Sequence, residues 1–85
     1  MGGGVNNTAG AYATVAGGAQ NYSSALISNI GGGQNNTNTG YIATIGGGDH
    51  NYNSANEGTI AGGQNNIVSI GYQPTVGGGY SNQAT

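Results

Sequence analysis

The sequence predicts an all-β fold, a parallel β-solenoid with coils of about 15 residues. One short phrase recurs six times, once in clipped form: it ends a strand on a β-branched residue, turns on glycines and reaches an asparagine. A fixed short period of this kind is typical of solenoids and repeat arrays. We interpret residues 1–85 as a single array of about five and a half coils, a segment of a longer fibre. The β-branched residues, spaced 15, 15, 15 and 16 apart, are Val15, Ile30, Ile45, Ile60 and Val76.

Each coil is predicted to contain a rigid block of 12 residues, which runs from a Gly or Ala to an asparagine. All variation in length falls between that asparagine and the next Gly or Ala. Loops tolerate insertions and stacked strands do not, because one extra residue turns every side chain to the other face. We therefore expect one elastic loop in each coil, at residues 8–9, 22–24, 37–39, 52–54 and 67–70.

Inside the block, alternation with a period of two predicts a strand. The β-branched residues should stack on its inner face as a structural core column. The opposite face carries the apolar residues Tyr12, Ile27 and Ile42. Burial on both faces marks a sheet that lies between its own coil and another chain. We therefore expect these three residues to lie in an interface between chains.

An asparagine recurs at the same place in every copy of the phrase. Identical amides stacked at the strand spacing of ~4.8 Å can hydrogen-bond along the column. Asparagine also tolerates a left-handed turn. We interpret the column as a structural ladder rather than as a ligand site. Its members are Asn7, Asn21, Asn36, Asn51, Asn66 and Asn82.

The charge of the chain narrows its possible partners. It contains no Lys or Arg, so the cationic groups that bind nucleic acid or an anionic membrane surface are missing. No apolar run approaches the ~18 residues of a membrane-spanning helix, and we expect no direct membrane insertion by this segment. The absence of cysteine excludes a disulfide framework.

Catalytic, metal and cofactor sites are not expected. The only carboxylates are Asp49 and Glu57, and the only histidine is His50. Acid–base catalysis needs two tuned groups in a cleft, whereas Asp49 and His50, as neighbours on a strand, would point to opposite sides and be solvated. A Ca²⁺-binding β-roll needs an Asp in each glycine-rich turn, and one turn of six has it. We therefore predict that the chain is not an enzyme.

The repeat units resemble the YadA-like head repeats of trimeric autotransporter adhesins, and similar units occur in bacteriophage tail fibres. The resemblance covers essentially the whole chain, and residues 44–51, Thr-Ile-Gly-Gly-Gly-Asp-His-Asn, show the unit. The chain departs from the family in favouring Gly-Gly-Gly and Asn-Asn over Ser-x-Ala-x-Gly, and in its lack of basic residues. The resemblance implies a left-handed β-roll in a homotrimer around one axis. It also implies an extracellular place, on a bacterial cell surface or a phage virion.

These observations predict a non-enzymatic structural and adhesive module of an extracellular trimeric fibre. Its loops would give multivalent contact with a host matrix protein, a glycan or a cell surface. Tyr22 and Tyr52 are the candidate contact residues, because tyrosine combines an apolar ring with a polar tip. Two alternatives stay open: a filament subunit that stacks end to end, and an ice-binding solenoid. The ice-binding alternative depends on the column Thr14, Asn29, Thr44, Thr59 and Thr75.

Overall fold

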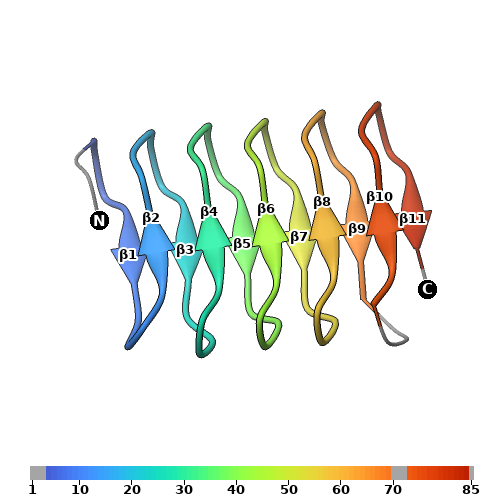
Figure 1. Ribbon diagram of the computed structural model, residues 1–85. Coiled ribbons are helices and arrows are strands. Elements are labelled where there is room, and N and C mark those ends of the chain that lie inside the picture. Colours follow the sequence, from blue (N-terminus) through green and yellow to red (C-terminus); the bar gives the residue numbers. More distant parts are fainter. Residues whose placement is uncertain (1–3, 70–72, 85) are drawn as a thin grey trace.

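The computed structural model describes residues 4–69 and 73–84, and within them it shows a parallel β-solenoid without helices (Figure 1). Two sheets run along the stack of coils. The first contains β1 (Thr8–Ala9), β3 (Tyr22–Ser23), β5 (Thr37–Asn38), β7 (Tyr52–Asn53), β9 (Ile67–Val68) and β11 (Gln83–Ala84). The second contains β2 (Thr14–Val15), β4 (Asn29–Ile30), β6 (Thr44–Ile45), β8 (Thr59–Ile60) and β10 (Thr75–Val76). The predicted fold class is confirmed.

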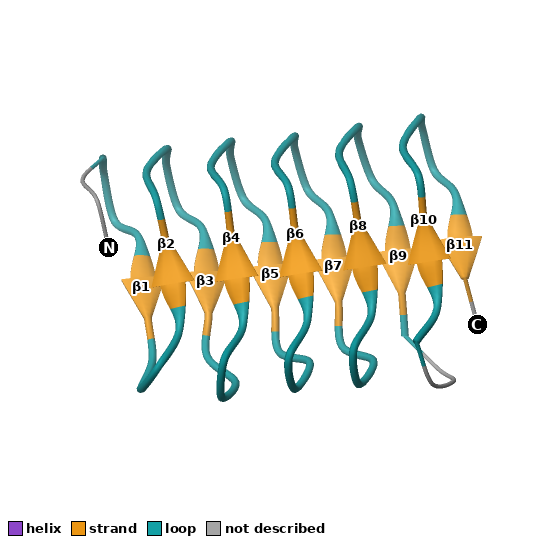
Figure 2. Cartoon of the chain, viewed as in Figure 1, coloured by secondary structure: helices purple, strands orange, loops and turns teal. Residues whose placement is uncertain are grey.

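Every strand pairs in parallel with the strand two positions along the chain, so each coil lies on the one before it (Figure 2). Val15 is paired with Ile30, and Ile30 with Ile45. A third line of parallel bridges joins the coils at the glycine-rich turns, for example between Gln34 and Asp49. Because the register repeats from coil to coil, residues in equivalent positions form columns along the solenoid.

The β-branched column lies inside the solenoid, between the two sheets. Val15, Ile30, Ile45, Ile60 and Val76 are at most 5% exposed and form one apolar cluster with Ala55 and Val68. This core is thin, since each coil contributes only one or two apolar side chains. The inward positions of the first sheet are mostly small or polar. They are Ala9, Ser23, Asn38, Asn53, Val68 and Ala84.

The stretches that the sequence predicted as elastic loops are instead the strands of the first sheet. The length of the coil varies in the turn that follows each of them, which has four residues after β1 and five after β3, β5 and β7. The backbone N–H of Gly10 donates to Ser23, and that of Ser24 donates to Asn38, so the ladder continues one residue past these strands. The loop prediction was wrong because spacing alone cannot place an insertion before or after a two-residue strand. Ile70 lies outside the described residues.

The strand predicted through Tyr12, Ile27 and Ile42 is also shorter than expected. These residues lie in the turns between the sheets and have φ of 59°, 58° and 53°, in the left-handed region. A left-handed residue breaks the alternation of a strand. Each strand of the second sheet therefore begins two residues later, at the Thr or Asn that precedes the core column.

Candidate functional site

The asparagine ladder ties neighbouring coils together through the backbone. The Asn51 side chain donates to the carbonyl of Gly47 in its own coil, at 2.9 Å, and to that of Gly63 in the next coil, at 3.0 Å. Its Oδ1 accepts the backbone N–H of Asn66 at 2.9 Å. All polar atoms of this buried amide are therefore paired, and Asn21, Asn36 and Asn66 are buried with the same pattern. In these four buried members the amide is fully paired within the solenoid and offers no group to a ligand.

Two details of the ladder differ from the sequence prediction. Its amides mostly bond to backbone groups, and the described ladder shows one direct amide pair, from Asn36 to Asn21 at 3.1 Å. The left-handed residue is the one before each ladder asparagine, for example Asn35 or His50 at φ 56°. Placing that residue first lets the ladder side chain turn inward to the carbonyls of the glycine turn.

The glycine turn must come close to the next coil for these bonds to form. Gly48 has φ of 100°, and a Cβ there would lie 2.1 Å from the carbonyl oxygen of Gly63. No side chain fits at that distance, and a positive φ of this size strongly favours glycine. The same glycine–glycine approach recurs at Gly33 and Gly63. The third glycine of the phrase is thus required by packing between coils.

A second pair of buried asparagines was missed by the sequence analysis. Asn38 and Asn53 point inward from β5 and β7, and both are fully buried. The Asn53 amide donates to the carbonyls of Thr44 and Gly58, at 3.1 and 2.9 Å. The Oδ1 atoms of both residues have no hydrogen-bond partner. The signal for this pair was present, but it fell in a stretch interpreted as a loop.

Asp49 and His50 form a pair on the surface. His50 Nδ1 lies 2.7 Å from Asp49 Oδ1, and both side chains are more than 40% exposed. The prediction that they point to opposite sides was wrong, because the left-handed backbone of His50 removes the strand alternation. The described residues contain no group of three or more His, Cys, Asp or Glu side chains that could hold a metal ion.

One edge of the solenoid is apolar and exposed. The turns between β1 and β2, β3 and β4, and β5 and β6, along the lower edge in Figure 1, carry five large side chains that are 41–81% exposed. We call these residues the apolar edge: Tyr12, Leu26, Ile27, Tyr41 and Ile42. The sequence analysis assigned three of them to a strand face and missed Leu26 and Tyr41. In the next coil the edge becomes polar, at Asn56 and Glu57.

The two candidate contact residues lie on the outward face of the first sheet rather than in loops. Tyr22 is on β3 and Tyr52 on β7, with 45% and 41% of their surfaces exposed. Thr37 on β5 pairs with both, so it lies between them. We call Tyr22, Thr37 and Tyr52 the tyrosine column.

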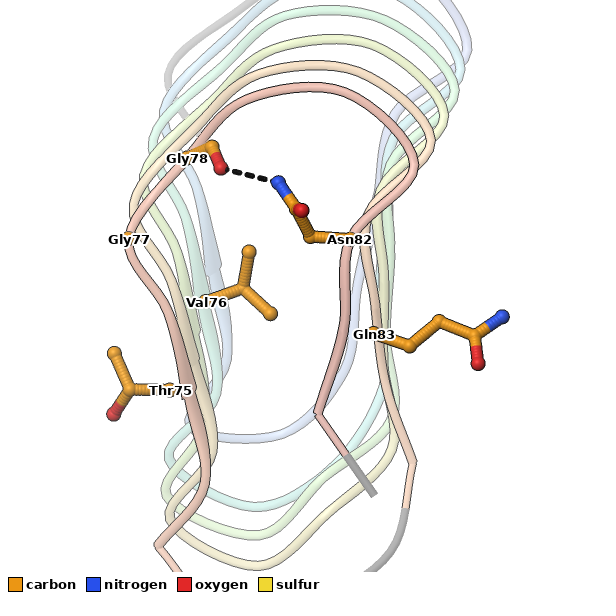
Figure 3. Close-up of a pocket in the computed structure, with 6 residues that line it drawn as sticks. All are labelled: Thr75, Val76, Gly77, Gly78, Asn82 and Gln83. Atoms are coloured by element: carbon orange, nitrogen blue, oxygen red, sulfur yellow. Dashed lines mark hydrogen bonds between the residues drawn. The ribbon is translucent and has the colours of Figure 1, made fainter.

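The end of the last described coil is hollow (Figure 3). Val76 and Asn82 point into it, and the Asn82 amide donates to the carbonyl of Gly78 at 2.7 Å. Thr75 and Gln83 point away from it on the two sides of the coil. None of the lining residues has a titratable side chain. The hollow is the cross-section on which a further coil would lie, and its lining lacks the groups that acid–base catalysis uses.

The fold therefore defines a β-solenoid repeat scaffold whose accessible features are an apolar edge and two flat faces. No helix in the described part of the chain is long and apolar enough to cross a membrane. No family model, curated protein or solved structure matches the chain.

Proposed function

We propose that the chain is a non-enzymatic structural and adhesive module of an extracellular trimeric fibre. The observation that carries this proposal is the apolar edge, where large apolar side chains are held out from the scaffold. Several large apolar side chains exposed together along one edge mark an interaction site, whereas single exposed apolar residues do not. The chain has two carboxylates and no Lys or Arg, so association through this edge would depend on apolar contact.

The backbone of the apolar edge supports this assignment. A β-branched residue with positive φ is rare and strained, by roughly 1–3 kcal/mol. Ile27 and Ile42 both have this conformation, and their side chains are 47% and 41% exposed. Within a single chain this strain brings little burial in return, and Asn or Gly would fit the turn better. Covering of the edge by neighbouring copies would offset the strain.

The proposed contact with other surfaces is multivalent. Three parallel copies would present the outward sheet faces as repeated stripes along the fibre. Individually weak contacts on such stripes gain strength through effective concentration. The contact groups would be strand side chains on a rigid face, since the predicted loops are strands. The proposed place is a bacterial cell surface or a phage virion, on the resemblance of the repeat.

The assembly part of the proposal is tested by Ile27→Asp with Ile42→Asp. Charges buried in an apolar interface without partners strongly oppose association, so the double variant is expected to elute as a monomer in size-exclusion chromatography. Asn29→Asp with Thr44→Asp is the matched control, because these exposed residues lie in the same coils on the second sheet. An oligomer that persists in the double variant would contradict this interface. The ice-binding and end-to-end alternatives stay predictions, tested by thermal hysteresis and by electron microscopy of fibres.

A further inference from the structure

The tyrosine column has a defined spacing along the solenoid. Tyr22 pairs with Thr37 and Thr37 with Tyr52, so the two tyrosines are two rungs apart. At ~4.8 Å for each rung, their Cα atoms are separated by roughly 9.6 Å. The backbone N–H groups of Tyr22 and Tyr52 donate to Asn36 and Asn66 in the following coils, at 2.8 and 2.9 Å. These backbone hydrogen bonds therefore fix the positions of the two Cα atoms from which the tyrosine side chains project.

The column has an apolar neighbour, Ile67 on β9, which pairs with Tyr52, and hydroxyl-bearing residues on the side where its strands end. The residue that directly follows each of the strands β3, β5 and β7 carries a hydroxyl group. These residues are Ser24, Thr39 and Ser54. These three residues continue the ladder, since their backbone N–H groups donate to the neighbouring coil. The face thus offers two phenol rings separated by one threonine, with a row of hydroxyl groups beside them. Rings with polar tips suit ligands that have both apolar faces and hydroxyl groups.

We propose that the tyrosine column binds an extended, uncharged β-1,4-linked polysaccharide that lies along the solenoid axis. Successive sugar rings of an extended β-1,4-linked chain advance by a distance close to one rung of the sheet, which is ~4.8 Å, so alternate rings would meet Tyr22 and Tyr52. The absence of Lys and Arg disfavours an acidic polysaccharide. A peptide strand cannot be added to this face, because the backbone groups of β3, β5 and β7 are already paired with those of neighbouring coils. The inference deepens the proposed function, on which it depends for the adhesive role of this face.

The experiment measures binding of the purified chain to two neutral β-1,4-linked solids, microcrystalline cellulose and chitin beads, by sedimentation. We expect saturable binding to at least one solid, with equal affinity at ~50 and ~500 mM salt because no charge is involved. Tyr22→Ala or Tyr52→Ala should weaken the affinity about tenfold, whereas Tyr22→Phe and Tyr52→Phe should retain most of it. Tyr80→Ala is the matched control, because Tyr80 is an exposed tyrosine of a glycine-rich turn and belongs neither to the tyrosine column nor to the apolar edge.

Circular dichroism of each variant establishes that the solenoid is intact. No binding of the folded chain to either solid, or full binding by a Tyr22→Ala, Tyr52→Ala double variant, would overturn the inference. Tyrosine-dependent binding to immobilised collagen without binding to the solids would also overturn it, in favour of a protein ligand. If the chain assembles through its apolar edge but binds neither solid, the polysaccharide inference is rejected and the proposed assembly is retained. If a monomeric chain binds one of the solids through its tyrosines, the polysaccharide inference is retained and the proposed trimer is rejected.

Discussion

The backbone N–H of Asn51 donates to the side-chain oxygen of Asn36 in the preceding coil, at 3.0 Å. The same relationship joins Asn36 to Asn21 and Asn66 to Asn51. Each of the four buried ladder asparagines thus satisfies one backbone donor in the next coil and two carbonyl groups at the glycine turns. In a solenoid with so thin an apolar core, this buried polar column contributes much of the specificity of stacking.

Asn51→Ala should destabilise the chain more than Asn53→Ala. The first change leaves the Asn66 N–H and the Gly47 carbonyl without the Asn51 side chain, and it leaves the Gly63 carbonyl with only the Asp49 N–H, for an expected loss of about 3 kcal/mol. The second removes two bonds but also removes an oxygen that had no partner, so we expect a loss of about 1 kcal/mol. Urea unfolding followed by circular dichroism measures both. Equal losses would show that the two asparagine columns are equivalent, contrary to the observed bonding.

Gly48→Ala and Gly62→Ala form a matched pair in adjacent turns. A Cβ at Gly48 would collide with the Gly63 carbonyl, and φ there is 100°, so we expect a loss of at least about 2 kcal/mol in the free energy of unfolding. A Cβ at Gly62 would meet nothing within 4 Å. That change should leave stability unaltered or raise it by about 0.5 kcal/mol, through the lower entropy of the unfolded chain. A thermal melt that ranks the two variants the other way would contradict the packing described for the glycine turn.

Ile42→Asn should change chain stability and association in opposite directions. Asparagine accepts φ of 53° more readily than isoleucine does, so the fold within one chain should gain about 1 kcal/mol. Association should weaken, because an apolar side chain leaves the proposed interface. The first effect is measured by urea unfolding at the lowest practical concentration, and the second by sedimentation velocity over a concentration series. Stronger association in the variant would argue against the role of this edge.

The sequence allowed the fold class and the inner column to be predicted, because residues such as Ile30, Ile45 and Ile60 recur with an unchanging period. The strands of the first sheet could not be recognised, since each is two residues long and carries mixed side chains, such as Thr37 and Asn38. A run this short has no detectable alternation. The turn at Ile42 was hidden for a related reason, because an isoleucine at positive φ contradicts the ordinary preference of that residue.

The candidate sites were predicted in part. Tyr22 and Tyr52 could be chosen from their residue type and their spacing of 30, but their place on one flat face follows from the pairing of both with Thr37. The partners of the buried Asn53 amide come from two different strands and turns, which a linear sequence does not bring together. The apolar edge was recognised through Tyr12, Ile27 and Ile42. Leu26 and Tyr41 were missed because only the face opposite the core column was considered for an interface, and a turn exposes neighbouring residues together.

We propose above all that three copies of this solenoid join along their apolar edges to form a fibre. Multi-angle light scattering of the purified chain, coupled to size-exclusion chromatography, measures this most directly. We expect the wild-type chain to form a single species with three times the molar mass of one chain. The Ile27→Asp, Ile42→Asp double variant should have the molar mass of a single chain. A wild-type chain that is folded by circular dichroism but keeps the molar mass of a monomer at concentrations up to about 1 mM would contradict the proposed trimer.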